Sequence, residues 1–299
     1  MDPGKDMPDG YTHTFEQVIF HSLKRGNSVI TAVLVGLESS KILLFFTYIL
    51  KLTNKKIMED FVQKIGPVAF KMKFIKGDSF KMGQPDPNLY GSSWSKYQQP
   101  VHSVKVPDFY LAEYPVTQEL YASVMGNNPS WFQGKNRPVE QVSWKDAKTF
   151  IEKLNNQSKK LKYRLPSESE WEYAARGGKD WEKGFPFSGG KELRKLGWYR
   201  ENSHHETQDV GLRAPNQLGL YDMSGNVWEW CEDDFHESYK EAPNDGTSWT
   251  DSPKRAYDRV LRGGSWSFDA DSCRVADRNR NYPDSWYRFY GFRLAASLP

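Results

Sequence analysis

The sequence predicts an α+β domain whose C-terminal half is built mainly of short strands and long loops. Two strand-like stretches occupy residues 70–83 and 102–117, and three helical stretches follow between Thr117 and Gly178. After Gly178 we find no long periodic segment, only short apolar stretches separated by Gly, Pro, Asn and Asp. Long loops are uncommon in compact domains and are often functional, so this half is where a site is expected.

The strand-like stretches are recognised by their turn residues and their alternation. FKMKFIKGDSFKMG (70–83) predicts two short strands separated by a Lys-Gly-Asp-Ser turn at 76–79. HSVKVPDFYLAEYPVT (102–117) alternates apolar and polar residues and breaks at Pro107, which is again typical of strands. These stretches precede the helices and supply the β part of the predicted fold.

The first two helices are predicted from capping residues and apolar spacing. TQELYASVMG begins at Thr117, a suitable N-cap, and ends at Gly126. SWKDAKTFIEKL is capped by Ser143. Its apolar residues recur at the spacing of one helix face and are Ala147, Phe150, Ile151 and Leu154. Both helices are therefore expected to pack against the domain core.

The third helix is predicted within PSESEWEYAARGG. Ser167 and Glu170 stand at the spacing of a capping box, and Gly177 is placed to end the helix. Further on, GNVWEW places Trp228 and Trp230 at alternating positions, which is typical of a strand that contributes to a core.

Composition excludes some classes of function. The chain of 299 residues has 41 basic and 38 acidic residues and a net charge of +3, so nothing favours a nucleic-acid partner. Aromatic residues make up 15%, including 11 Trp, which suits a loop-rich core or a binding face. Only Cys231 and Cys273 occur, without metal-binding spacing. We expect two buried thiols, or one disulfide if the two meet in space.

Residues 1–66 are predicted to form an N-terminal extension that is partly helical. The apolar stretch 28–52 is interrupted by Glu38 and Lys41, and each uninterrupted run is well short of the ~20 residues that span a bilayer. No membrane span is therefore expected. The stretch also has no clear signal-peptide cleavage site and no cysteine for a lipid anchor.

Six motifs from about residue 67 onwards occur in an order that resembles one family. They are FKMG, VHSVKVPDFYLAEYPVTQELY, PVEQVSWKDA, YRLPSESEWEYAARGG, LGLYDMSGNVWEW and RVLRGGSW…GFRLA. The sequence is similar to domains of the formylglycine-generating enzyme (sulfatase-modifying factor) type, a variant of the C-type lectin fold. The resemblance implies that this fold covers residues 67–299. It does not fix the function, because one fold hosts many sites.

The resemblance also bears on catalysis. The oxidases of this family use two closely spaced cysteines after the GGS motif, and thiolates suit both copper binding and thiol exchange. Here the corresponding SFDADSCRVADR contains only Cys273. The related sulfoxide synthases hold iron with three histidines, whereas none of the six histidines here shows the H-x-x-x-H spacing. We expect a protein that is not an enzyme and has no redox cofactor; an oxidoreductase of this superfamily with an unrecognised site stays as the alternative.

The resemblance implies a structural calcium site in LYDMSGNVWEW (220–230). Its matching positions are Asp222 and Glu229 as side-chain ligands, with Gly225 and Val227 as carbonyl donors. Such mixed oxygen ligands are what Ca²⁺ accepts. The alternative is a tight turn in which the two carboxylates accept hydrogen bonds from backbone N–H groups.

The segment from about 266 to 290 has the composition of a contact surface. Val275 is the only Val, Ile or Leu between Trp266 and Gly291, although a buried strand would be rich in these residues. Aromatic and small polar side chains dominate instead, as in antibody paratopes. The predicted contact residues are Ser267, Phe268, Asp269, Asp271, Ser272, Asp277, Tyr282, Ser285, Trp286, Tyr287, Phe289 and Tyr290.

These residue types also share a regularity in the genetic code. Ser, Asp, Tyr, Phe, Ala and Asn are all reachable from the Asn codon AAC by changing only adenines, whereas Trp286 is not. The segment resembles the variable region of proteins diversified by retroelements, such as those of spirochaetes like Treponema.

The resemblance implies a non-catalytic, receptor- or adhesin-like protein at the cell surface or outside the cell, with a protein or cell-surface ligand. A structural or carbohydrate-binding module is a third class. The binding hypothesis predicts that the large residues of the segment are exposed on one face. They are Phe268, Asp269, Tyr282, Trp286, Tyr287, Phe289 and Tyr290.

Overall fold

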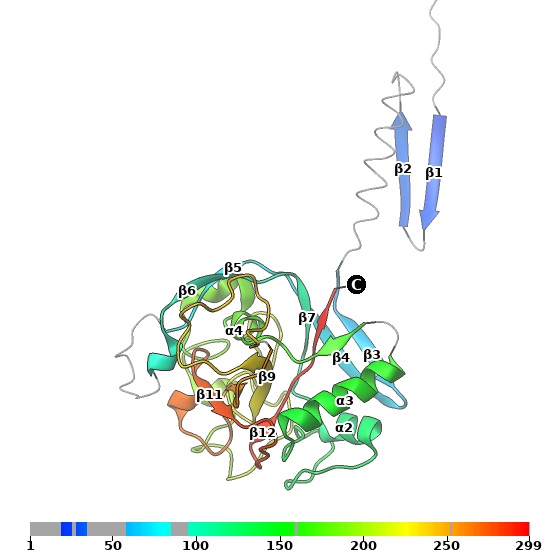
Figure 1. The fold of residues 1–299 in the computed structure, drawn as a ribbon. Helices are drawn as coiled ribbons and strands as arrows, with labels where there is room; N and C mark the ends of the chain where they lie inside the picture. The colour runs from blue at the N-terminus through cyan, green and yellow to red at the C-terminus, as the bar shows by residue number, and fades with distance from the viewer. Residues whose placement is uncertain are drawn as a thin grey trace, which may run out of the picture. The chain divides into compact units, whose positions relative to one another are not determined.

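The computed structural model describes residues 19–25, 28–34, 58–84, 95–158, 161–251 and 253–298. The chain divides into two compact units, Met1–Met58 and Glu59–Pro299 (Figure 1). In the first unit, β1 (Ile19–Arg25) and β2 (Ser28–Leu34) pair antiparallel. We predicted a partly helical extension, but these stretches are strands, because β-branched residues such as those in SVITAVL favour extended backbone. The rest of that prediction concerns residues outside the described ones.

The second unit begins earlier than the predicted boundary at residue 67. β3 (Phe61–Ile65) and β4 (Val68–Ile75) form an antiparallel hairpin, so that boundary falls inside a pair of strands. Gly66 has a φ of 55°, which the tight turn between them requires. The domain therefore starts at Glu59.

The larger of the two main sheets of the domain has five strands. Its order is β3-β4-β7-β13-β8, with β7 at Phe109–Ala112, β8 at Tyr163–Arg164 and β13 at Ala295–Ser297. β13, from the end of the chain, pairs antiparallel with both β7 and β8. The GFRLA motif thus leads into the middle of a sheet, which anchors the segment before it at its C-terminal end.

Two helices pack beside this sheet (Figure 1). α2 spans Gln118–Met125 between the N-cap Thr117 and Gly126, whose φ is 84°. α3 spans Trp144–Gln157 behind a capping box at Ser143 and buries its four predicted apolar residues. Both helix predictions are confirmed.

The third predicted helix is also confirmed as α4 (Glu168–Ala175), with Ser167 and Glu170 forming the capping box. α4 is tied to a second sheet by buried ion pairs. Arg278 donates to the two Glu168 carboxylate oxygens at 2.6 and 2.8 Å, and Arg262 lies 2.5 Å from Glu172. These paired charges fix where the strands that carry the arginines lie.

The second sheet has the order β11-β10-β9-β12. Its strands are β9 (Trp228–Asp234), β10 (Arg259–Arg262), β11 (Arg278–Asn281) and β12 (Tyr290–Gly291). Trp228 and Trp230 are buried as predicted. Because the chain between β10 and β12 holds only four residues of strand and one short helical turn, the predicted variable region is mostly loop.

The remaining elements are short. β5 (Ser79–Met82) pairs with β6 (His102–Lys105), which confirms strands in both predicted stretches. The other elements are η1 (Ser95–Gln98), η2 (Gly178–Lys183), α5 (Leu193–Leu196) and η3 (Ala270–Cys273). The predicted α+β fold with a loop-rich C-terminal half is confirmed. Among the described residues, no helix is both long and apolar enough to cross a membrane.

Candidate ligand-binding site

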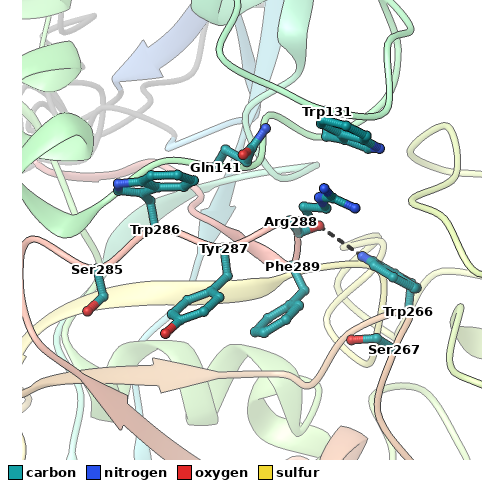
Figure 2. A pocket seen from close by; sticks show the side chains of 9 residues that line it. All are labelled: Trp131, Gln141, Trp266, Ser267, Ser285, Trp286, Tyr287, Arg288 and Phe289. Carbon is teal, nitrogen blue, oxygen red and sulfur yellow. Dashed lines mark hydrogen bonds between the residues drawn. The ribbon is translucent and has the colours of Figure 1, made fainter.

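A hollow of about 780 Å³ opens on the surface where the segment 266–289 meets the loop between α2 and α3 (Figure 2). Its lining consists of aromatic rings with a few polar groups. The lining residues are Trp131, Gln141, Trp266, Ser267, Ser285, Trp286, Tyr287, Arg288 and Phe289. Seven of these nine belong to the C-terminal segment, and two come from the loop.

One wall of the hollow is a row of aromatic rings. Tyr287 and Phe289 are stacked, with ring centroids 5.3 Å apart and planes at 10° (Figure 2). Phe289 in turn meets Phe268 edge to face at 5.3 Å, and Phe268 meets the buried Trp228 in the same way. Phe268 and Phe289 are therefore half-buried supports, while Tyr287 is 47% exposed.

The opposite wall is built around Trp131, which is 57% exposed. The Arg288 guanidinium lies 3.7 Å from the centre of the Trp131 ring, a cation–π contact between the loop and the segment. The Trp266 indole N–H donates to the Arg288 carbonyl at 2.9 Å, and Phe132 meets the Trp266 ring edge to face. Loop and segment are thus packed into one surface.

A buried carboxyl stands next to this wall. Glu140 is fully buried; its Oε1 accepts from the Phe132 N–H at 2.8 Å, and its Oε2 has no partner among the described residues. Burial raises the pKa of Glu140 to about 7, against the opposing effects of the Phe132 and Trp131 N–H groups, Arg288 and Arg137. Near neutral pH this carboxyl is only partly ionised.

Main-chain hydrogen bonds hold the segment in place. Several of its carbonyl oxygens accept from backbone N–H groups that lie elsewhere in the chain. These bonds run from Arg200 to Phe268, from Gln141 to Tyr287, from Trp228 to Phe289 and from Lys145 to Pro283, at 2.8 to 3.2 Å. A carbonyl is present whatever the side chain, so this anchorage does not depend on residue identity along the segment.

The twelve predicted contact residues differ in burial: five are exposed, five are half-buried and two are buried. The exposed ones are Asp269, Asp271, Tyr282, Trp286 and Tyr287. The half-buried ones are Ser267, Phe268, Ser272, Ser285 and Phe289. Five of the twelve line the hollow together, namely Ser267, Ser285, Trp286, Tyr287 and Phe289. Of the exposed and half-buried ones, Phe268, Asp269, Asp271, Ser272 and Tyr282 lie outside its lining.

The prediction is wrong for Asp277 and Tyr290, which are buried. Asp277 accepts from the Gln98 side-chain amide at 2.9 Å, and burial raises the pKa of its carboxyl to about 7. Tyr290 begins β12, packs edge to face on Trp230 at 5.1 Å, and accepts from the Asn281 amide at 2.9 Å. Tyr290 is turned inward by the pairing of β12 with β9, whereas Asp277 directly precedes β11 and is buried against Gln98.

Four residues of the lining were missed by the sequence reasoning. Trp266 belongs to the RVLRGGSW part of the family motif, and Arg288 stands between the predicted contact residues Tyr287 and Phe289 without being one of them. Trp131 and Gln141 lie far from the segment in sequence, and no local pattern marks them. Gln141 has a φ of 58°, a strained value for a non-glycine residue that only the structure reveals.

The residues of the predicted calcium site are engaged by protein donors. Both Glu229 oxygens accept from Arg293, at 2.6 and 2.7 Å, and the Trp171 indole N–H donates to one of them at 2.7 Å. Asp222 accepts from the Gly211 N–H at 2.8 Å and from the Asn226 amide at 3.3 Å. A bidentate guanidinium already neutralises Glu229.

The residues as arranged therefore do not fit the predicted calcium site. Glycine is needed in this loop for space, since a side chain at Gly225 would collide with the Trp198 carbonyl. In the described part of the chain, no three His, Cys, Asp or Glu side chains are grouped to hold a metal ion.

The two cysteines are free and buried. Cys231 belongs to the core cluster around α4 and β9, whereas Cys273 packs with Leu193 and Tyr199 in a separate cluster. Of the two expected arrangements, separate buried thiols are observed. Burial raises the pKa of both thiols, so neither is an activated nucleophile. A side chain at Gly264 would approach the Cys273 sulfur to 2.5 Å, which explains the glycine.

Comparisons with known proteins agree with the fold. The profile of the sulfatase-modifying factor enzyme 1-like domain matches residues 63–298. The solved structure of Treponema denticola variable protein 1 superposes with a TM-score of 0.69 at 32% identity, covering 80% of this chain and 99% of that one.

Curated relatives have diverse names. The chaperone protein LppX of Paenibacillus barcinonensis is 32% identical over 74% of this chain and 89% of its own length. The formylglycine-generating enzyme of Thermomonospora curvata is 33% identical over 77% of this chain and 94% of its own. The chain spans 39% of the chlamydial serine/threonine-protein kinases that it also matches. The chain belongs to the family of sulfatase-modifying factor enzyme 1-like domains and has the C-type lectin-like fold of the formylglycine-generating enzyme type.

Proposed function

We propose that this protein is a non-catalytic, receptor- or adhesin-like protein that binds a protein ligand in the hollow lined by its C-terminal segment. The observation that carries the proposal is the convergence of five predicted contact residues on that hollow, on a main chain anchored from outside the segment. Similarity to a variable protein supports a diversified binding surface.

The chemistry of the hollow suits recognition. Trp286 and Tyr287 are exposed and offer a large contact area with little conformational entropy to lose. Ser267 and Ser285 add hydroxyl oxygens that can accept hydrogen bonds, and the Ser285 hydroxyl itself donates to the Asn281 side chain at 2.9 Å. Gln141 donates its own amide to the Pro129 carbonyl, so this part of the wall is already ordered. An ordered surface loses less entropy when it binds.

The test is a binding selection from a displayed library. Codons for Ser267, Ser285, Trp286, Tyr287 and Phe289 are randomised, and the library is selected against a purified protein such as lysozyme. A matched control library randomises three exposed apolar residues outside the hollow, Val62, Leu212 and Tyr257. We expect folded, specific binders from the first library and none from the second. Equal yields, or a first library that does not fold, would contradict the proposal.

Diversification by a retroelement is part of the proposal and has a test at the DNA level. The gene's neighbourhood is expected to contain a reverse transcriptase and a near-copy of the segment's coding sequence with Asn codons at the varied positions. We also propose a location at the cell surface, which protease treatment of intact cells would detect as cleavage of this chain. Full protection from the protease would count against that location.

An enzyme is the second candidate, favoured by the similarity to a formylglycine-generating enzyme over nearly its whole length. The burial and separation of Cys231 and Cys273 speak against it. The decisive assay incubates the protein with copper, dioxygen, a thiol reductant and a cysteine-containing peptide and measures formylglycine by mass spectrometry. The proposed function expects no product, whereas product that Cys273→Ser abolishes would establish the enzyme.

A further inference from the structure

We propose that the hollow binds an acidic peptide segment, in which an Asp or Glu carboxylate pairs with Arg288 and a neighbouring apolar side chain rests against Tyr287. This inference rests on the proposed ligand-binding function and names the chemistry of its ligand. It follows from the charges around the hollow, from the geometry of Arg288 and from the nature of the lining.

Arg288 is the charged group of the lining, and none of the residues that the structure describes neutralises it. Its side chain is exposed, and no described carboxylate lies within ion-pairing distance of its guanidinium. The cations around it are compensated. Those pairs are Arg200 with Asp269 at 2.7 Å, Arg137 with Glu206 at 3.1 Å and Lys145 with Asp284 at 2.8 Å. An anionic ligand group is what complements the remaining charge.

Arg288 is also held in position before any ligand arrives. The Trp131 ring supports its guanidinium at 3.7 Å, and Trp266 fixes its main chain through the carbonyl. Stacking on one face of the planar guanidinium leaves its edge N–H groups available, and these match a carboxylate in a bidentate manner. Little side-chain entropy remains to be lost when the anion binds.

Glu140 does not substitute for the ligand carboxylate. Arg288 is near enough to oppose the rise in the pKa of Glu140, but the Glu140 carboxyl is fully buried and its Oε1 accepts from the Phe132 N–H. Since its pKa is raised to about 7, its charge is incomplete at neutral pH. Arg288 therefore keeps most of its attraction for an outside anion.

The lining favours a peptide over a carbohydrate. Sugars need many hydrogen-bonding groups around a stacked ring, whereas the polar uncharged side chains of the lining, apart from the indole N–H groups, are only Gln141, Ser267, Ser285 and Tyr287. Gln141 is already engaged with Pro129. The stacked rings of Tyr287 and Phe289 instead offer apolar area for a side chain such as Phe or Leu.

The experiment uses two blocked dipeptides that differ in one charge, N-acetyl-Asp-Phe-amide and N-acetyl-Asn-Phe-amide. The full-length ¹⁵N-labelled protein is titrated with each, and the indole N–H signals of Trp131, Trp266 and Trp286 are followed by NMR. We expect the Asp peptide to shift these signals and to bind about fivefold more tightly than the Asn peptide, as expected for a charge-assisted hydrogen bond at an exposed site. In Arg288→Gln the preference disappears.

The matched control is Lys145→Gln, which removes a cation that bonds Asp284 of the same segment. It is expected to keep the preference for the Asp peptide. Equal affinity of the two peptides for the wild-type protein, a preference that survives Arg288→Gln, or no shift with either peptide would overturn the inference. These results leave the library selection untouched, and failure of that selection would instead reject the proposed binding function.

Discussion

At the scale of single residues, the buried Glu140 carboxyl beside the hollow makes the stability of the folded protein depend on pH. Its carboxyl has a pKa of about 7 in the folded protein against an ordinary value of 4.5. The folded state therefore binds this proton more tightly than the unfolded state between these two values. Stability contributed by the protonated form is present at low pH and declines as pH rises towards 7.

We accordingly expect Glu140→Gln to flatten the pH dependence of the free energy of unfolding. Relative to the variant, the wild-type protein should lose up to about 3 kcal/mol between about pH 4.5 and about pH 8. Denaturant unfolding at both pH values measures this difference. Asp222 and Asp277, whose pKa values are also raised, are present in both proteins and cancel in the comparison. Parallel pH profiles would show that Glu140 has an ordinary pKa.

A second residue-scale prediction concerns calcium. Because Arg293 already binds both oxygens of Glu229, we expect neither added Ca²⁺ nor EDTA to change the melting temperature. Calorimetric titration should likewise show no heat of binding. A rise in melting temperature with Ca²⁺ in the wild-type protein, but not in Glu229→Gln, would mean that the ion displaces the guanidinium from Glu229.

The same pair has a stability role. Arg293→Met leaves the Glu229 carboxylate buried without its counter-charge, and we expect a loss of about 3–5 kcal/mol. The double variant Arg293→Met, Glu229→Gln removes the isolated charge and should recover part of that loss. Urea unfolding of the three proteins measures the difference, and a double variant no better than the single one would contradict the electrostatic cause.

At the scale of elements, the C-terminal segment separates into side chains that face outward and side chains that support the sheet. Tyr287→Ala removes a half-exposed ring stacked on Phe289, while the Gln141 N–H keeps hold of the main chain, so we expect a loss of only about 1 kcal/mol. Tyr290→Ala removes a ring packed on Trp230, and we expect a loss of about 3–5 kcal/mol. Thermal unfolding of both variants tests the division, with Tyr290→Phe as the control that keeps the ring.

The sequence predicted those structural features whose physical cause lies in residues close together in the chain. Helices α2, α3 and α4 were predicted with their caps, because capping residues and apolar spacing act within a few turns. Burial of Asp277 was missed, because its partner Gln98 comes from a distant part of the chain. For the same reason no local sequence pattern indicates that Trp131 stacks on Arg288. Five of the residues that the C-terminal segment contributes to the site were predicted, whereas Trp266, Arg288 and the two residues from the loop between α2 and α3 were missed.

At the scale of the whole molecule, the domain boundary has a measurable consequence. β3 belongs to the large sheet, and Phe61 packs edge to face on Tyr110 at 5.0 Å. A fragment of residues 59–299 is therefore expected to fold with the melting temperature of the full chain. A fragment of residues 67–299 loses β3 and should melt earlier. Circular dichroism of both fragments measures the two melting temperatures. Equal values would support the predicted domain boundary at residue 67.

The amide-to-carbonyl anchorage of the closing segment also shapes how such a protein can evolve. If several side chains of the segment change in one event, the backbone hydrogen bonds that hold it remain, since each N–H donor belongs to a part of the chain outside the segment. At the exposed positions, such as Trp286 and Tyr287, a new specificity then needs no compensating mutation in the backbone contacts. Change at the supporting positions Phe268, Phe289 and Tyr290 is limited by packing as well as by recognition.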